Sequence, residues 1–294
     1  MNLRAFIRLS RIEHGILTSL IVIASYVIAG GRSAIAMVFL FLSSLLTEIF
    51  LFITNDIYNI EEDRINRPDA PLVRGEVSIS EAWVLSLLSI IAAILLNVLG
   101  IVMGGYLMIW SIVILIMAIV LGFSYNYRLK KVIVVNNVFV AITSSLTFLY
   151  GLYAVSSTIP TLNLPYLLFI VSFLATMGRE LVKGAIDVAG DVRAGVKTVA
   201  NTYGIKTAVT LAVIFTLVAV LISPLIIIHA FRNPPYGLVL SAGILITDVI
   251  LMYISIVLLR NSNYMGRFRV LSLGGAMAIT IIAYLLFALL VIVH

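Results

Sequence analysis

The sequence predicts an all-α membrane protein, a polytopic bundle of nine transmembrane helices around a central cavity, formed by residues 1–294 as one domain. Hydrophobic residues make up 62% of the chain and charged residues only 11%, whereas a soluble domain carries roughly 25% charged residues. The mean hydropathy is +1.19. Apolar runs long enough to cross a membrane recur along the chain, and basic residues gather in alternate connections between them.

Nine apolar runs match the thickness of a bilayer core, because each holds about 17–24 residues and roughly 20 are needed to span it. They cover residues 14–30, 34–54, 82–103, 105–123, 133–155, 164–182, 206–229, 237–259 and 270–293. Gly104 and Gly105 fall between the third and fourth runs, which predicts a tight turn between two antiparallel helices.

The basic residues predict the orientation of the bundle. If the N-terminus is cytoplasmic, all of the 19 Lys and Arg residues except Arg32 and Arg232 fall on the cytoplasmic side. Cytoplasmic connections of membrane proteins carry such an excess. We therefore expect a multi-pass protein of the cell membrane with its N-terminus inside and its C-terminus outside. The same bias accounts for the net charge of +6, so no nucleic-acid partner is expected.

Two polar clusters interrupt the apolar chain, each at the end of a span and both on the expected cytoplasmic side. The first cluster is residues 55–64. Its Asn55, Asn59 and Asp63 recur every four residues, so on a helix they lie along one face. A carboxylate at a membrane boundary is costly unless it is paired or bound to a metal. The cluster is therefore a candidate functional site.

The second cluster is residues 179–191, in which Lys183, Asp187 and Asp191 share the same spacing. Each cluster is followed by a basic, Gly-containing connection and then a further helix. The chain thus contains two pseudo-repeats, and the last helix has no counterpart. Repeated halves of membrane folds commonly place a site at their interface, so we expect the two clusters to face one cavity.

The oxygen donors of the clusters predict a magnesium site. Mg²⁺ takes six oxygen ligands, usually one or two carboxylates together with waters and substrate phosphate. Zinc would need Cys or His, but the chain has no cysteine and its three histidines are scattered. The predicted Mg²⁺ ligands, which are also catalytic candidates, are Asn55, Asn59, Asp63, Asp187 and Asp191.

Basic residues around the clusters predict that the metal holds a diphosphate. Arg binds phosphate oxygens through two donors and Lys as a point charge. Together with a metal, they hold a diphosphate and stabilise it as a leaving group. The predicted phosphate-binding residues are Arg64, Arg67, Arg74, Arg128, Lys130, Arg179, Lys183 and Lys197.

Other acidic residues have different expected roles. Asp56 falls outside the four-residue spacing of the first cluster and could serve either the site or its support. Glu61 and Glu62 are expected to be solvated loop charges. Glu48 lies within an apolar run and could be structural or line the cavity. Asp248, in the eighth run, is expected to form a hydrogen bond to a neighbouring helix.

Three motifs connect the clusters with a known family. The first is Asn55-Asp-x-x-Asn59-x-x-x-Asp63, followed by Arg64-Ile-Asn-Arg67-Pro68-Asp-Ala-Pro71-Leu-Val-Arg74-Gly75. The second is Arg179-Glu180-x-x-Lys183-Gly184-x-x-Asp187-x-x-Gly190-Asp191-x-x-x-Gly195-x-x-Thr198. These two resemble the paired signatures of the UbiA superfamily of intramembrane prenyltransferases. Between them, Tyr125-Asn-Tyr-Arg128 is similar to the family's Tyr-x-x-Lys/Arg element, which adds Tyr125 to the catalytic candidates. Asn137 and Gly151 fall where the family's fifth helix carries Asn and Gly.

The resemblance covers the whole chain and implies a reaction. It implies a prenyl diphosphate, Mg²⁺, departure of pyrophosphate, and attack on the allylic carbon by an acceptor in the lipid phase. The short length and the form of the second motif are most similar to archaeal digeranylgeranylglyceryl phosphate synthases. For that branch the donor would be geranylgeranyl diphosphate and the acceptor geranylgeranylglyceryl phosphate, giving an ether membrane lipid. Two positions depart from the family pattern, because Asn59 and Gly184 stand where many members carry Asp.

Two other functions use the same sequence features. A prenyltransferase with an aromatic acceptor, as in quinone or haem-tail biosynthesis, would share the donor chemistry. A cation-coupled secondary transporter could bind its ion through acidic helix ends. Transport sites usually lie near the membrane midplane, however, whereas both clusters are expected on one face.

Overall fold

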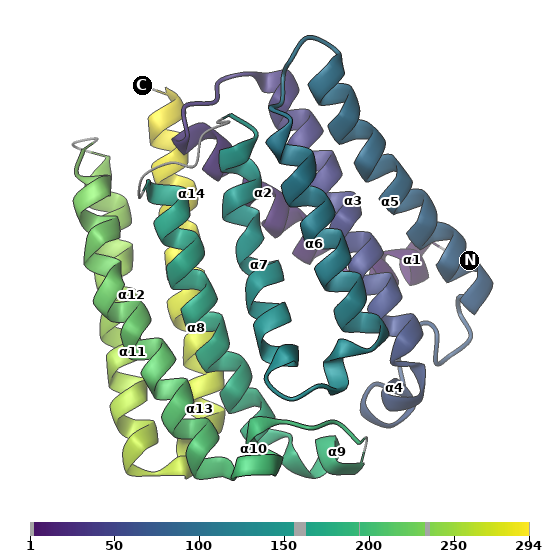
Figure 1. Ribbon diagram of the computed structural model, residues 1–294, viewed down its shortest axis with the longest axis vertical. Coiled ribbons are helices and arrows are strands. Elements are labelled where there is room, and N and C mark those ends of the chain that lie inside the picture. Colours follow the sequence, from purple (N-terminus) through teal and green to yellow (C-terminus); the bar gives the residue numbers. More distant parts are fainter. Residues whose placement is uncertain (1–2, 156–162, 194, 233–235, 294) are drawn as a thin grey trace.

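The computed structural model describes residues 3–155, 163–193, 195–232 and 236–293, and within these ranges the chain forms helices and no strand. Long helices run side by side through the molecule (Figure 1). They are α2 (Ile12–Ile28), α3 (Ala34–Tyr58), α5 (Ile79–Val102), α6 (Trp110–Tyr127), α7 (Val135–Tyr153), α8 (Leu164–Ile186), α11 (Ile205–Ala230), α12 (Gly237–Arg260) and α14 (Ala278–Val293).

The number of spans agrees with the sequence. In the described part of the chain, eight helical segments are long and apolar enough to cross a membrane. A ninth is added when the short helix α1 (Leu3–Ser10) and α2, bent by 51°, are taken as one span. The eighth segment is composite, since it joins η2 (Ser262–Tyr264), α13 (Met265–Val270), η3 (Leu271–Met277) and α14. The predicted all-α, nine-span membrane bundle is confirmed.

The helices form two groups on either side of α7 (Figure 1). On one side, α3 packs against α2, α5 and α6. On the other, α11 packs against α8 and α12, and α12 packs against α14. Helix α7 contacts α2 and α6 in the first group and α8 in the second, while α14 returns to contact α2. This arrangement places the ends of α3 and α8 at the same end of the bundle.

The first cluster lies where α3 gives way to the short helix α4 (Ile60–Asn66). Helix α3 continues four residues beyond its predicted end, so Asn55 is helical and Asn59 caps the helix. We expected Asn55, Asn59 and Asp63 to lie along one face of a single helix. The helix is instead interrupted at Asn59, between α3 and α4. The four-residue spacing still holds locally, since the Asn59 amide donates to the Asn55 carbonyl at 3.0 Å and the Asp63 amide to the Asn59 carbonyl at 2.8 Å.

The second cluster repeats this construction between α8 and the short helix α9 (Val188–Arg193). Asp187 caps α8, with its amide 3.0 Å from the Lys183 carbonyl. The Asp191 amide in turn donates to the Asp187 carbonyl at 2.9 Å. Here too α8 extends four residues past its predicted end. In each half of the chain a long helix ends, the chain turns, and a short helix that contains an aspartate follows, as the two pseudo-repeats predict.

Two helix starts near the site carry capping boxes, which satisfy backbone amides that a helix start leaves without partners. Ser78 and Glu81 form one at the start of α5. Thr198 and Asn201 form the other at α10 (Val199–Tyr203). The second box holds Thr198 beside the end of α8.

Helix α7 packs very closely against α2 at Gly151. A β-carbon added at Gly151 would lie 2.2 Å from the Val22 carbonyl oxygen and 2.7 Å from the Tyr26 amide nitrogen, both in the backbone of α2. Small residues in membrane helices allow such close backbone approach. The surrounding residues Tyr26, Leu152 and Phe287 are all buried, so this contact lies within the largest apolar core.

The last span contains a π-helical segment, η3, between α13 and α14. Single π turns inside α-helices often mark functional sites, and the wider turn alters the hydrogen bonding of the backbone. The Thr247 hydroxyl of α12 donates to the Ala276 carbonyl at 3.0 Å and lies 2.9 Å from the Thr280 hydroxyl. Helix α12 therefore supplies polar partners to the distorted turn.

Candidate functional site

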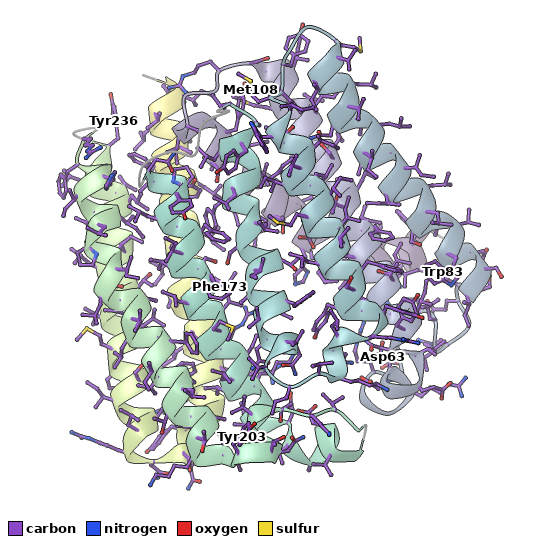
Figure 2. The ribbon with its side chains drawn as sticks, viewed as in Figure 1. Asp63, Trp83, Met108, Phe173, Tyr203 and Tyr236 are labelled. Carbon is purple, nitrogen blue, oxygen red and sulfur yellow. The ribbon has the colours of Figure 1, made fainter. Side chains whose placement is uncertain are left out.

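The two clusters meet at one end of the bundle, with the connection between α6 and α7 lying between them (Figure 1). Asp63 and Tyr203 mark this end, while Met108 and Tyr236 mark the opposite one (Figure 2). The connection contains the short helix η1 (Leu129–Lys131). Within it, the Lys130 ammonium lies 2.9 Å from Asn59 Oδ1 and forms an ion pair with Glu62. The same Lys130 lines a pocket beside the second cluster. One cation thus contacts the first cluster and lines the same pocket as the second cluster.

This pocket, called the interfacial pocket below, has a volume of about 70 Å³. It lies next to α9 and the N-cap residue of α10, where the end of α6, the start of α7 and the end of α8 come together. Its lining residues are Tyr125, Lys130, Asn136, Asn137, Glu180, Lys183, Gly184, Asp187, Asp191, Val196 and Thr198. Polar groups thus surround a space large enough for a small anion.

Asn126 of α6 sets the orientation of Asn55. Its side-chain amide donates to the Leu51 carbonyl at 2.9 Å and to the Thr54 hydroxyl at 3.0 Å. Its carbonyl oxygen accepts from Asn55 Nδ2 at 2.9 Å. Because the Asn55 amide nitrogen is engaged in this way, its oxygen Oδ1 remains the group available to a ligand.

Asp56 and Asp63 are both buried against arginines. Asp56, only 2% exposed, accepts from Arg11 at 2.6 Å and from Arg67 at 3.2 Å. Arg67 also lies 3.4 Å from Asp63. Burial raises the pKa of the Asp63 carboxyl, and the charge of Arg67 opposes that rise. Asp56 therefore supports the first cluster by holding two arginines, which answers the question that its position in the sequence left open.

Arg11 reaches Asp56 because the chain bends sharply between α1 and α2. The backbone of Arg11 is left-handed, with φ 45°. This conformation costs a non-glycine residue energy and persists only where the surroundings impose it. Helix α1 is held there by Ala5 and Leu9, which are buried against Ile53. Arg8 of α1 also pairs with Glu76 at 3.2 Å. The N-terminal helix is therefore tied to the first cluster.

Replacing Arg11 with glutamine is expected to lower the free energy of unfolding by about 1–3 kcal/mol, the cost of leaving a buried charged group short of a partner. The apparent melting temperature in detergent would measure the loss. Arg64→Gln is the matched control, because Arg64 pairs with Glu61 at the surface, where their side chains are 62% and 76% exposed. Such pairs contribute little. Equal melting temperatures for the two variants would contradict the role given to Arg11.

The second cluster offers two carboxylates to the interfacial pocket. Among the described residues, neither Asp187 nor Asp191 has a side-chain hydrogen bond or an ion pair. Burial raises the pKa of Asp191, and the nearby charge of Asp187 raises it further, while Lys183 and Lys130 lower it. Two half-buried carboxylates without described partners are the arrangement that a divalent cation would stabilise.

The donor set fits magnesium rather than a metal held entirely by protein. In the described part of the chain, no three His, Cys, Asp or Glu side chains are grouped to hold a metal ion. Mg²⁺ commonly takes only one or two carboxylates and completes its shell with waters and phosphate. Asp187 and Asp191 could supply those carboxylates, with the amide oxygens of Asn55 and Asn59 across the site. Asp63, in contrast, is engaged by Arg67.

The structure divides the predicted phosphate-binding residues into two sets. Lys130 and Lys183 line the interfacial pocket. The other six lie outside it. Arg64 pairs with Glu61, Arg67 with Asp56 and Asp63, Arg74 with Asp69 and Glu76, and Arg179 with Glu180; Arg128 lies over the ring of Tyr127, and Lys197 is exposed.

Some residues of the site were not among the predicted ones. Asn136 and Thr198 line the pocket, and Glu62 is paired with Lys130 rather than solvated, which corrects that expectation. Asn126 is only 8% exposed. A buried amide in an apolar helix, directly after Tyr125, was the signal that could have identified Asn126. Asn59 stands where the resemblance leads one to expect Asp, and its side-chain oxygen accepts a hydrogen bond from Lys130.

A second cavity lies deeper in the bundle, among α7, α8, α11, α12 and α14, and is called the membrane cavity below. Its volume is about 130 Å³, and its walls are mostly apolar. Asp248 lines this cavity and accepts from Ser223 of α11 at 2.6 Å. The predicted hydrogen bond to a neighbouring helix is confirmed. Glu48 lines a smaller cavity between α2, α3, α6 and α7.

Comparison with known proteins identifies similar chains over nearly the whole length. Residues 17–271 match the UbiA prenyltransferase family. A digeranylgeranylglyceryl phosphate synthase from Sulfurisphaera tokodaii is 32% identical over 271 residues, which cover 89% of this chain and 89% of that protein. The protein of the same name from Sulfolobus acidocaldarius is 32% identical over 258 residues, covering 87% of this chain and 88% of that protein.

Solved structures share the fold. One, from a study of digeranylgeranylglyceryl phosphate synthase in membranes, has a TM-score of 0.79 and 24% identity, covering 97% of this chain and 98% of its own. Another is a UbiA homologue from Archaeoglobus fulgidus bound to GPP and Mg²⁺, with a TM-score of 0.74 and 18% identity over 99% of this chain and 100% of its own. At these identities the likeness concerns the arrangement of the helices.

Proposed function

The chain belongs to the UbiA prenyltransferase family, and from this premise we propose that it transfers a geranylgeranyl group from geranylgeranyl diphosphate to geranylgeranylglyceryl phosphate. It is a multi-pass membrane prenyltransferase. The products would be an ether lipid precursor and pyrophosphate, and the reaction would depend on Mg²⁺. The names of the curated relatives support the acceptor, and the homologue bound to GPP and Mg²⁺ supports the donor class and the metal.

The observation that carries the proposal is the position of Lys130. It contacts Asn59 and Glu62 of the first cluster and lines the interfacial pocket with Asp187 and Asp191. A diphosphate in this pocket would therefore meet cations and metal ligands from both halves of the chain. This is the arrangement expected for a site at the interface of two repeats.

The roles of the residues follow from their positions. Asp187 and Asp191, with Asn55 and Asn59 across the site, would hold Mg²⁺, which when bound neutralises the diphosphate as it leaves. Asp63 would complete the set if it exchanged its pairing with Arg67 for the metal. Lys130 and Lys183 would add positive charge on the same anion. Tyr125 also lines the pocket and would direct its hydroxyl towards the phosphate end of the donor. These groups act together to stabilise the charge that develops on the leaving group.

The reaction exchanges one carbon–oxygen bond for another. The bond between the allylic carbon and the diphosphate oxygen breaks, and its electron pair leaves with pyrophosphate. A new bond forms between that carbon and the acceptor hydroxyl oxygen, whose proton passes to the departing pyrophosphate. Because water would compete with the acceptor, the reacting carbon should lie on the membrane side of the diphosphate. With the site at the cytoplasmic end, the donor would enter from the inner face of the membrane.

The purified protein in detergent, supplied with Mg²⁺ and labelled geranylgeranyl diphosphate, tests the acceptor directly. We expect turnover with geranylgeranylglyceryl phosphate, and loss of turnover when EDTA removes the metal. Turnover only with a hydroxybenzoate or a naphthoate would replace the ether-lipid assignment with the aromatic one. Ion-driven uptake into proteoliposomes without release of pyrophosphate would support a transporter instead.

Lys130→Gln is expected to raise the KM for the prenyl diphosphate by about tenfold or more, as expected for a lost hydrogen bond between charged groups. Steady-state kinetics at saturating acceptor would measure it. Lys131→Gln is the matched control, because Lys131 is the neighbouring exposed lysine of η1 and should leave the KM unchanged. A similar rise in both variants would show that only the overall positive charge of this connection matters.

A further inference from the structure

Arg179 faces a different space from the rest of the second cluster. It lines the membrane cavity, whereas its neighbours Glu180 and Lys183 line the interfacial pocket. Among the described residues that line the membrane cavity, Arg179 is the only basic one. Its side chain is 20% exposed. The cavity is thus a mostly apolar chamber with a single cation in its wall.

The contacts of Arg179 hold its guanidinium group in one orientation. Nε and Nη2 both donate to Glu180 Oε1, at 3.2 Å and 2.9 Å. Nη1 has a much weaker partner, the thioether sulfur of Met277 at 3.8 Å. A thioether is a poor hydrogen-bond acceptor. The Nη1 side of the guanidinium is therefore oriented in advance towards η3 without a strong acceptor.

Arg179 and Glu180 together form part of the wall between the two spaces. Because the two residues are adjacent on α8, an anion bound at Arg179 would lie close to, but separate from, a diphosphate in the interfacial pocket. The diphosphate already has two lysines there, Lys130 and Lys183. A second anionic substrate, in contrast, would meet no other basic residue among the described residues that line the membrane cavity.

We propose that Arg179 binds the phosphate of the acceptor lipid, and that it thereby selects a phosphorylated prenylglycerol over a neutral one. This inference rests on the proposed function. The acceptor is an anionic amphiphile, and the membrane cavity offers it one cation and mostly apolar walls. A guanidinium group binds phosphate oxygens through several donors at once.

The second charged residue of the cavity restricts where the phosphate can lie. Asp248 accepts a hydrogen bond from Ser223 and would repel an anion placed beside it. The phosphate is therefore held at Arg179, next to the interfacial pocket. The glycerol hydroxyl, a few bonds further along the acceptor, would then lie near the reacting carbon of the donor, and the prenyl chain would extend along the apolar walls.

The test compares two acceptors, the phosphorylated prenylglycerol and the same molecule without its phosphate. The wild-type protein is expected to prefer the phosphorylated acceptor in kcat/KM by about 10- to 100-fold, the range for a charge-assisted contact. Arg179→Gln should abolish this preference while leaving the KM for the donor diphosphate unchanged. Arg179→Lys keeps the charge but loses the several donors, and should retain part of the preference.

Three variants separate this role from others. Lys183→Gln should raise the donor KM without changing the acceptor preference. Arg260→Gln, which removes an exposed arginine at the end of α12, should change neither. If Arg179→Gln does not fold, Met277→Glu places a carboxylate beside Nη1 and should weaken use of the phosphorylated acceptor alone.

Several results would overturn the proposal. One is equal use of the two acceptors by the wild-type protein. Another is a loss in Arg179→Gln that affects both acceptors equally or raises the donor KM as Lys183→Gln does, which would limit Arg179 to pairing with Glu180. Turnover with aromatic acceptors only would reject the proposed function and this inference together, whereas the other two results would leave the proposed function intact.

Discussion

Replacing Asp187 with asparagine is expected to lower kcat by about 100- to 1000-fold, because a metal that stabilises the leaving group contributes several kcal/mol to the transition state. Asp187 lines the interfacial pocket, and its carboxylate has no described protein partner. Asparagine keeps the size of the side chain and the backbone hydrogen bond to Lys183. The concentration of Mg²⁺ needed for half-maximal rate should rise as well, and a titration would measure it.

Glu61→Gln is the matched control for Asp187→Asn. It also removes one negative charge from an acidic cluster at the same end of the bundle, but the side chain of Glu61 is 76% exposed. We expect its rate and its Mg²⁺ requirement to equal those of the wild-type protein. An Asp187→Asn variant with normal turnover would remove the second cluster from the metal site.

Gly151→Val is expected to disrupt the contact between α7 and α2 and to lower the yield of folded protein. Even Gly151→Ala should cost about 1–3 kcal/mol, the usual range for overpacking. The added β-carbon would lie 2.2 Å from the Val22 carbonyl oxygen, and a backbone atom cannot rotate away as a side chain can. The helices would have to separate within the buried core. Apparent melting temperatures in detergent, compared at one heating rate, would report the loss.

The control for Gly151 is the same change where space is open. A β-carbon at Gly266 of α13 would meet nothing within 4 Å. Alanine is a better helix former than glycine by about 1 kcal/mol, so Gly266→Ala should be neutral or slightly stabilising. If Gly151→Ala behaves in the same way, the two helices are not as closely packed as the structure indicates.

The fold could be predicted from the sequence because a membrane helix requires an apolar run of about 20 residues, and such runs are visible in the sequence. Every backbone group in the bilayer core must be satisfied within the span, so each apolar run of sufficient length became a helix. The repeated clusters were equally visible, since carboxylates are rare in this chain and cluster at the ends of α3 and α8. Their convergence at one end follows from the alternating direction of the spans.

The partners of the charged residues were less predictable, because charge and spacing do not determine where a long side chain points. Arg67 and Arg179 belong to the motifs of the clusters, yet one pairs with Asp56 and the other lines the membrane cavity. Asp56 also pairs with Arg11, which is far from it in the sequence. The contact of Arg11 depends on the bend between α1 and α2, which leaves no pattern in the hydropathy.

The surroundings of Gly184 could not be predicted from the sequence either. Its departure from the family pattern was evident in the sequence, but the space around it was not. The atoms nearest to a β-carbon there would be those of Thr198, at 3.5 Å or more, which is ordinary van der Waals contact. The glycine at this position is therefore not required by close packing against its nearest neighbour.

The π-helical segment η3 has a consequence for how the last span tolerates changes in length. A π turn accommodates one residue more than an α turn, so it takes up an added residue locally. Phe268 before the π-helical segment and Tyr284 after it are both 1% exposed. Both aromatic side chains can therefore remain directed towards the core. In the middle of a regular helix, an inserted residue would instead rotate everything beyond it by about 100°. The widened turn thus lets this span contain one more residue while the side chains on either side of it keep facing the core.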